Sequence, residues 1–274
     1  MSMSVRTNVS ALMGAGQLSR TNKGLANSLS RISSGFRVNK AADDAAGLGV
    51  ATNLETQIGS TRTAMRNIND GISIIQTAEG ASNEVTDILQ RMRELAVQSS
   101  SGTLGNTERS FIQDEFVQLR SEVSRIAQVT EFNGITLNNN TTSNINVQVG
   151  INSDGNSQIQ ITLGALTTNA LGISGILLDT AANALSALSV LDTAIGTVNS
   201  NRSVYGAAQN RLESALNNAG VQVEALSSAN SQIIDTDFAT ETANLTKLQI
   251  MQQAGVAALA QAKGINQSVI SLLS

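Results

Sequence analysis

Few side chains in this 274-residue sequence are suited to acid–base, nucleophilic or metal chemistry. The chain has no Cys and no His, so it lacks thiolate ligands and the commonest general base. The remaining candidates are two carboxylate pairs, Asp43 with Asp44 and Asp235 with Asp237. A calcium site needs a fuller set of oxygen ligands held in a turn. We therefore predict no enzyme activity, no cofactor and no metal, and interpret Asp43 and Asp44 as carboxylates at the start of a helix.

Other sites with a chemical signature are equally weak. Gly14 and Gly16 form a GxG pair that does not follow a strand, so it lacks the context of a dinucleotide site. Basic residues are scattered without interleaved aromatic residues, which predicts no nucleic-acid partner. The Asn-x-Ser/Thr triplets at Asn8, Asn139 and Asn201 are expected by chance in a chain rich in these residues.

The composition favours long, thin helices. The chain has 17 basic and 21 acidic residues, no Pro, no Trp, one Tyr and five Phe. Without Pro, helices can run uninterrupted, and the scarcity of large aromatic residues argues against a globular enzyme with a thick core. No apolar run approaches the ~18–20 residues that span a bilayer, so we predict no membrane insertion. The first residues lack the apolar segment of a secretory signal.

Three segments carry apolar residues at alternating four- and three-residue steps, the heptad pattern of helices packed along one another. They span residues 74–95, 112–126 and 188–233, and Arg202, Gln209 and Asn230 occupy seam positions of the third. Truncating a mid-seam leucine, Leu216→Ala, is expected to cost ~2–5 kcal/mol if the site is buried. The predicted core seam is Ile74, Val85, Ile88, Met92, Ile112, Phe116, Leu119, Val123, Leu191, Ile195, Leu212, Leu216 and Val223.

The segments between these helices have their own signals. From about residue 45 to 99 the pattern is helical. Local rules would break this helix at Gly71 and at Gly80, but the heptad seam that crosses Gly80 favours continuity there. We predict that Thr107 or Asn106 caps the next helix. The alternating segments 145–149 and 158–163, joined through Asp154-Gly155, predict a β-hairpin that must rest on the helices. We assign residues 131–166 to this hairpin region, within a core helical domain of residues 45–234.

The two ends of the chain, residues 1–44 and 235–274, lie outside this core domain. Each end is amphipathic, and a break is expected at Ser33-Ser34-Gly35. Gly14, Gly16 and Gly24 weaken the first helix by ~1 kcal/mol each relative to Ala. These thin helices should be marginal or disordered alone in water. Their apolar residues are Leu12, Leu18, Leu25, Leu29, Ile32, Leu245, Leu248, Val256, Leu259, Val269 and Leu272.

Several separated stretches, in the right order, resemble bacterial flagellin, the subunit of the flagellar filament. The resemblance covers roughly residues 5–135 and 180–273, with Phe36, Val38 and Ser274 departing from the usual residues. The stretches are SSGFRVNKAADDAAGLGVA (33–51), DGISIIQTAEG (70–80), LQRMRELAVQS (89–99), TEFNGITL (130–137) and most of residues 235–273.

The resemblance implies a mainly α fold: an elongated antiparallel helical bundle or coiled coil with a small β-hairpin region and paired terminal helices. It implies that one long helix continues through Gly71 and Gly80, and that residues 1–44 and 235–274 pair as one discontinuous terminal domain. It implies a short flagellin without large outer domains, exported without a cleavable signal into the extracellular filament. Implied partners are further copies of the chain, an export chaperone at the carboxyl-terminal segment, and the filament cap and hook-junction proteins. Arg91, Leu95 and Glu115 map to the surface that Toll-like receptor 5 recognises in many flagellins.

Three other interpretations remain open. A hook–filament junction protein has a similar plan, although the matches at both ends favour flagellin. An amphipathic membrane-surface protein would bind anionic lipid through residues 1–42 and would not self-assemble. Residues 1–42 also hold six basic and no acidic residues, the composition of a transit peptide, but that would not explain the matching features of the other end.

Overall fold

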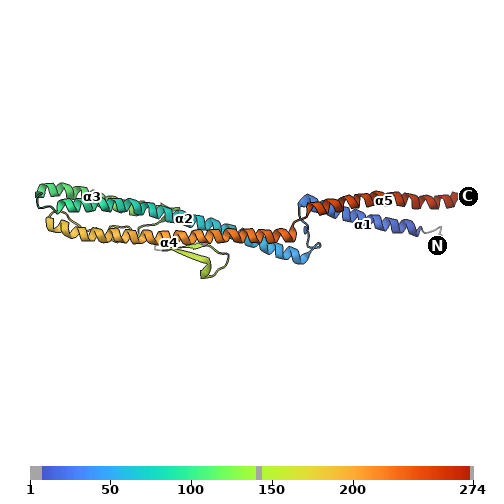
Figure 1. Cartoon of the computed structure of the whole chain (residues 1–274), viewed down its shortest axis with the longest axis horizontal. Coiled ribbons are helices and arrows are strands. Elements are labelled where there is room, and N and C mark those ends of the chain that lie inside the picture. The colour runs from blue at the N-terminus through green and yellow to red at the C-terminus, as the bar shows by residue number, and fades with distance from the viewer. Residues whose placement is uncertain (1–7, 140–143, 272–274) are drawn as a thin grey trace. The chain divides into compact units, whose positions relative to one another are not determined.

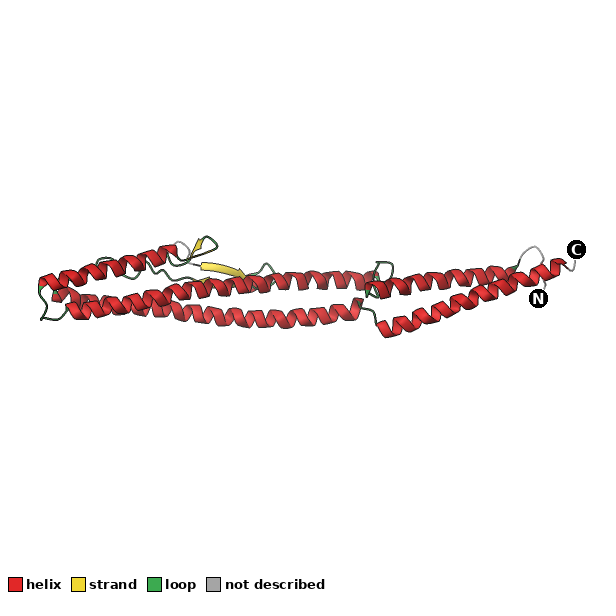
Figure 2. Cartoon of the chain, turned by 90° about the horizontal axis from the view of Figure 1, so that it is seen from above, coloured by secondary structure: helices red, strands yellow, loops and turns green. Residues whose placement is uncertain are grey.

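The computed structural model describes residues 8–139 and 144–271, with side chains as far as residue 264. This part of the chain is mainly α-helical, as predicted, with two small antiparallel strand pairs (Figure 2). The helices are α1 (Val9–Ser34), α2 (Ala45–Ser99), α3 (Asn106–Val129), α4 (Ala181–Ile234) and α5 (Phe238–Ser271).

The chain divides into two compact units. Its two ends, Met1–Thr56 and Ala225–Ser274, form one, which we call the terminal unit, and Gln57–Glu224 form the other, the core unit. Helices α2 and α4 each contribute residues to both units. The expected domain limits at residues 44 and 235 coincide instead with the breaks between successive helices, α1 to α2 and α4 to α5.

In the core unit, α2, α3 and α4 run side by side (Figure 1). Their heptad residues form a cluster in which alanines such as Ala96, Ala184 and Ala194 are as fully buried as Phe116. Small side chains let the helices approach closely, so the layer between them needs few aromatic residues. This explains how a chain with five Phe and one Tyr builds a continuous core.

Helix α2 continues through both Gly71 and Gly80, as predicted. The two glycines differ in their surroundings. A Cβ at Gly71 would lie 2.9 Å from Cγ2 of Val147, whereas nothing lies within 4 Å of that position at Gly80. Gly71 therefore provides the space against which the hairpin strand carrying Val147 packs.

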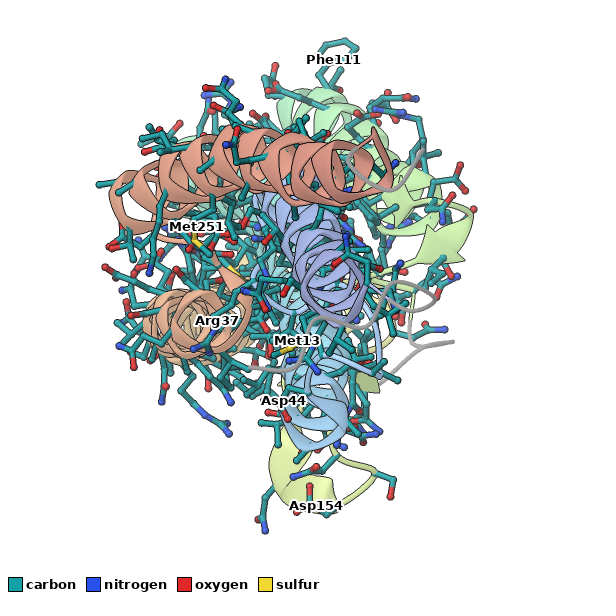
Figure 3. The ribbon with its side chains drawn as sticks, turned by 90° about the vertical axis from the view of Figure 1, so that its right-hand side faces the viewer. Met13, Arg37, Asp44, Phe111, Asp154 and Met251 are labelled. Atoms are coloured by element: carbon teal, nitrogen blue, oxygen red, sulfur yellow. The ribbon has the colours of Figure 1, made fainter. Side chains whose placement is uncertain are left out.

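The predicted hairpin is confirmed as β3 (Asn144–Gln148) paired antiparallel with β4 (Gln158–Thr162). The inward residues Val147, Ile159 and Ile161 join a second core cluster with Tyr205 and Leu212 of α4. The tip, residues 151–156, is fully exposed, and Asp154 caps the short 3₁₀ turn η1 (Gly155–Ser157) at its outer end (Figure 3). The hairpin thus rests on the helices through one face only.

Strands β1 (Glu131–Phe132) and β2 (Ile135–Thr136) form a second, two-residue ladder. Asn133 and Gly134 join them with φ angles of 50° and 77°, the left-handed conformations that a tight hairpin turn requires. The tight turn predicted from this Asn-Gly pair is therefore confirmed.

The link from β4 to α4 was not anticipated as a packed element. Its apolar residues, including Leu166, Ile173 and Leu178, are buried in the helix cluster. The backbone N–H of Leu178 donates to Gln113 Oε1 at 2.5 Å, and its carbonyl accepts from Ser99 Oγ at 2.7 Å. Polar side chains of α2 and α3 therefore hold this link at Leu178, close to the start of α4.

The prediction that Thr107 or Asn106 caps α3 is wrong, because Gly105 is the N-cap and both residues already lie inside the helix. The side chain of Glu108 folds back over Gly105 and occupies the space that a Cβ would need. The nearby Arg109 is buried, and its guanidinium donates to the carbonyls of Ser99 and Ser101 at 3.0 and 2.8 Å. These two bonds cap the end of α2.

Candidate assembly interface

The terminal unit is built on an antiparallel pair of helices, α1 and α5, which run side by side (Figure 1). Six of the eleven predicted apolar residues are half-buried in this terminal unit. They are Leu18, Leu25, Ile32, Leu245, Leu248 and Leu259. The pair also contains small residues at the contact, since Leu18 lies against Gly255 of the opposite helix.

Polar side chains link α1 and α5 at several levels along the pair. Asn8 Nδ2 donates to the carbonyl of Ala262 at 3.0 Å, and Gln252 Nε2 donates to Asn22 Oδ1 at 2.8 Å. Nearer the other end, Asn244 Nδ2 donates to Ser28 Oγ at 3.3 Å. Buried or half-buried polar residues in a seam restrict the register in which helices pair. Sequence reasoning missed them because each is an ordinary polar residue until its partner is known.

Three of the predicted apolar residues instead point to solvent. Leu12, Leu29 and Val256 are 71, 58 and 55 % exposed. They are not alone, because Val9, Met13, Phe238, Ile250 and Met251 of the same two helices are also exposed. The number of exposed apolar residues on these two helices makes the pair the candidate for an assembly contact. The last two predicted residues, Val269 and Leu272, lie outside the residues whose side chains are described.

The two chain ends meet where they leave the core helices. The N–H of Arg37 donates to the carbonyl of Ile234 at 2.6 Å, and the N–H of Thr236 donates to that of Gly35 at 2.9 Å. The Arg37 guanidinium also donates to the carbonyl of Ile233 at 2.7 Å, where α4 ends. This short antiparallel contact joins residues about 200 positions apart, so no local pattern could have predicted it.

Three of the four carboxylates singled out for their chemistry accept hydrogen bonds from backbone amides. Asp43 Oδ2 accepts from the N–H of Lys40 at 3.0 Å, and Asp44 Oδ1 accepts from that of Gly47 at 2.8 Å. Asp237 accepts from the N–H groups of Ala239 and Thr240 at the start of α5. The hydroxyl of Thr240 and these amides lower the pKa of Asp237. Asp44 thus lies at the start of α2, as interpreted, whereas Asp43 closes the turn that precedes it.

The predicted core-seam residues lie in the helix contacts of the core unit. Eight are buried: Ile74, Val85, Met92, Ile112, Phe116, Val123, Leu191 and Leu212. Ile88, Leu119, Ile195, Leu216 and Val223 are half-buried. Of the polar seam residues, Arg202 lies 4.0 Å from Glu79 of α2, and Gln209 donates to Glu213 of its own helix. Asn230 Oδ1 is buried and has no hydrogen-bond partner among the described residues.

One property of α4 was not expected from the sequence. By length and composition alone, α4 is apolar enough to cross a membrane, with a mean hydropathy of 1.3 over 18 residues. The average is high because alanines and seam residues alternate with only a few charges. Leu191, Ala194 and Val198 of α4 are fully buried in the core, so we interpret α4 as a core helix.

The residues mapped to a receptor surface divide into two groups. Arg91 and Glu115 are exposed and paired, with Nε and Nη2 of Arg91 at 3.0 and 2.9 Å from Glu115 Oε1. Glu94 also accepts from Arg91, and hydrogen bonds to Glu94 and Glu115 raise the pKa of Arg91. Leu95, in contrast, is 1 % exposed and packs in the core. Leu95 occupies a heptad seam position, and its side chain is therefore not part of the surface that presents Arg91 and Glu115.

Comparison with protein families gives two matches that cover most of the chain. The model of the bacterial flagellin N-terminal helical region matches residues 5–143, and that of the C-terminal helical region matches residues 188–273. The two models together match residues 5–143 and 188–273, which include most of the helical residues of this chain.

Individual relatives agree. The chain is 38 % identical to the flagellar filament 33 kDa core protein of Treponema phagedenis, over 99 % of this chain and 100 % of that protein. It is 42 % identical to a flagellin of Halalkalibacterium halodurans, over 89 % and 90 % of the two chains. Polar flagellin C of Vibrio parahaemolyticus aligns over 383 positions at 34 % identity, so it carries sequence that this 274-residue chain lacks.

Solved structures show the same helical plan. The crystal structure of Bacillus cereus flagellin matches with a TM-score of 0.50 and 34 % identity, over 56 % of this chain and 88 % of that one. A putative flagellar hook-associated protein from Vibrio parahaemolyticus has a TM-score of 0.60 over 70 % of this chain and all of that one. At 14 % identity the second match shows a shared fold alone.

The paired terminal helices, the heptad core and these matches define a structural protein of the bacterial flagellar filament. The chain belongs to the bacterial flagellin family, as a short form, and the relatives favour a filament subunit over a hook–filament junction protein.

Proposed function

We propose that copies of this chain polymerise through the exposed apolar residues of α1 and α5. The observation that carries the proposal is the set of exposed apolar residues that includes Leu12, Met13, Ile250 and Val256, on a helix pair too thin to bury them. A second copy offers the same residues and so has the chemistry to cover them. Contacts of this kind that do not close on themselves build an open helical polymer.

Folding of the ends is, in this proposal, coupled to assembly. Helix α1 buries only Thr21 and Ser28 fully and contains three glycines before its cap, so little holds it as a helix in the free subunit. Contacts with neighbouring copies then supply the missing burial. A subunit whose ends order only at the growing end stays soluble until it arrives there.

The remaining partners follow from family membership. We infer an extracellular filament, reached by export without a cleavable signal, in which a chaperone holds the apolar carboxyl-terminal segment beforehand. The filament cap and hook-junction proteins would contact the same terminal surface. The exposed residues Ile250 and Val256 support a chaperone contact of this kind, because they are apolar and lie on the terminal segment.

Seeded sedimentation with electron microscopy tests the polymerisation proposal. Full-length chain is mixed with short filament seeds, beside versions lacking residues 1–44 or 235–274. Filaments from the full chain that are lost in both truncations are expected. Filaments that survive truncation would move the essential contact into the core helices, and a full-length chain that stays monomeric with seeds would overturn the proposal.

Point variants sharpen the test without removing a helix. Leu12→Asp and Val256→Asp each place a charge on an exposed apolar position, so we expect them to block elongation. Gln17→Asp adds the same charge at an exposed polar position of α1 and is expected to elongate normally. Equal elongation by all three would contradict an apolar contact at these positions.

The Arg91–Glu115 pair favours a second candidate function, recognition by Toll-like receptor 5. The pair presents an exposed cation and carboxylate side by side on α2 and α3. Arg91→Ala and Glu115→Ala are expected to reduce signalling in a reporter cell that expresses the receptor. Arg125→Ala, which removes an equally exposed arginine paired with Glu122, is the matched control. Unchanged signalling by Arg91→Ala would overturn this assignment.

A further inference from the structure

Three glycines of the α1–α5 pair each lie beneath a leucine of the opposite helix. A Cβ at Gly14 would lie 3.4 Å from Cγ of Leu259, and one at Gly24 would lie 3.3 Å from Cδ2 of Leu248. In the reverse direction, a Cβ at Gly255 would lie 3.4 Å from Cδ1 of Leu18. The distance at Gly24 is shorter than most real Cβ contacts, and those at Gly14 and Gly255 are at van der Waals contact. Any side chain longer than a methyl group would therefore meet the leucine, and we call each glycine the seat of that leucine.

The seats are reciprocal and define one antiparallel register. Leucines of α5 fill the seats of α1, and a leucine of α1 fills the seat of α5. Sliding α5 by one turn would move Leu248 from Gly24 onto Arg20 or Ser28, where a side chain already stands. In a wrong register, all three leucines therefore lose their places over the glycines, and they clash with the side chains that they meet instead.

Gly16 shows that not every glycine of α1 has this role. Nothing lies within 4 Å of a Cβ placed there, and the residue is exposed. Glycine is unfavourable inside a helix, so its presence at positions 14 and 24 opposes local helix formation. At those two positions the space that it leaves is used by a partner helix, whereas at position 16 it is not.

We propose that Gly14, Gly24 and Gly255 are specificity-determining positions for filament assembly. By admitting Leu259, Leu248 and Leu18, they fix which helix pairs with α1 and in which register. Only a chain with complementary leucines can then order its ends correctly as it joins the polymer. This inference rests on the proposed function, in which the ordered terminal helices form the assembly contact.

The first test compares the same substitution at filled and open positions. Gly24→Leu and Gly14→Leu put a side chain into an occupied seat, whereas Gly16→Leu adds the same side chain to open space. In seeded assembly we expect the critical concentration to rise about tenfold or more for the first two, because overpacking is strongly unfavourable. Gly16→Leu is expected to elongate like the unmodified chain.

Exchanging the glycine and the leucine between the two helices distinguishes loss of this contact from a general folding defect. Gly24→Leu combined with Leu248→Gly moves the large side chain to α1 and the space to α5, so it keeps the volume of the contact. We expect this double variant to assemble better than either single variant. No rescue, or equal critical concentrations for Gly24→Leu and Gly16→Leu, would overturn the inference.

Register is read directly by crosslinking, since the chain has no cysteine of its own. Ser28→Cys with Asn244→Cys places two thiols at side chains that are 3.3 Å apart, while Thr21→Cys with Asn244→Cys reports a shift of one heptad. A short bifunctional thiol reagent is expected to join the first pair and not the second in filaments. Adding Gly24→Leu should lower the yield of the first pair, and an unchanged yield would overturn the inference.

The same reagent distinguishes the two proposals. If the unmodified chain does not polymerise with seeds, the proposed function fails, and the crosslinking is carried out on the soluble full-length chain. Selective joining of residues 28 and 244 that Gly24→Leu abolishes would still support the glycine seats. A crosslinking yield that Gly24→Leu does not change would overturn the role of the glycines, whether or not the chain polymerises.

Discussion

The hydroxyl of Tyr205, on α4, accepts a hydrogen bond from the backbone N–H of Gly164 at 2.9 Å. Tyr205 is fully buried, and its burial raises the pKa of the phenol. The amide of Asn201, one turn earlier on α4, fills the space where a side chain at position 164 would stand. Asn201 and Tyr205, one turn apart on α4, therefore fix the point at which the chain leaves β4. Asn201 is also the first residue of an Asn-x-Ser triplet, and it is half-buried.

Replacing this phenol leaves a backbone donor unpaired. We expect Tyr205→Phe to lower the free energy of unfolding by about 1–3 kcal/mol, because the N–H of Gly164 loses its acceptor in a partly buried place. Urea unfolding followed by circular dichroism measures the change. Ser186→Ala removes an exposed hydroxyl from the same helix and should change stability by less than ~0.5 kcal/mol. Equal stability of Tyr205→Phe and the parent would show that the bond is dispensable.

The two glycines inside α2 should respond in opposite ways to alanine. Gly80→Ala is expected to stabilise the core by about 0.5–1 kcal/mol, since nothing lies near the added methyl group. Gly71→Ala should destabilise it, because the methyl group meets the branched side chain of Val147. Thermal unfolding gives the sign, and hydrogen exchange of the β3–β4 amides locates the loss. Two changes of the same sign would contradict the packing described for Gly71.

Leucines one turn apart on α4 should differ in their effect. Leu212 is fully buried, so Leu212→Ala is expected to cost ~2–5 kcal/mol. Leu216 was expected to cost as much if buried, but it is half-buried, so Leu216→Ala should cost clearly less. Parallel urea titrations of the two variants make the comparison. A larger loss for Leu216→Ala would mean that it has neighbours beyond those of the single chain.

The cap at Asp237 predicts a dependence on acid pH. Because its pKa is lowered in the folded chain, the cap stabilises α5 above the ordinary pKa of an aspartate, and this contribution is lost as the pH falls through the lowered value. Assembly with seeds should therefore weaken below about pH 4. Asp237→Asn removes the charge that titrates, so its assembly should vary less over the same range. Identical pH profiles for both chains would exclude a role for this cap.

The helices and the hairpin could be predicted because their causes are local. Heptad spacing, the absence of Pro and the Asn133-Gly134 pair each act within a few residues. The packed link at residues 164–178 has no period, so its burial depends on helices that lie far away in the sequence. The contact between Arg37 and Ile233 is hidden for the same reason.

The sequence predicted which residues of the terminal helices are apolar, but not which of them face the partner helix and which face solvent. Leu25 and Leu29 share the same amphipathic helix, yet the first is half-buried while the second is 58 % exposed. A narrow helix pair buries a narrow stripe, and the sequence does not mark where that stripe ends. The role of Gly24 could not be predicted either. From the sequence, this glycine only lowers the helix propensity of α1, and its use as space for Leu248 depends on the distant helix α5.

The tip of the β3–β4 hairpin has a consequence for how this protein can change over evolution. Residues 151–156 are exposed throughout, and the strands below the tip are held by their own ladder and by Val147. Asp154 stands at its outer end (Figure 3). Exposed loop tips tolerate insertions best, so whole additional domains or engineered epitopes can be grafted here while the helices beneath keep their contacts.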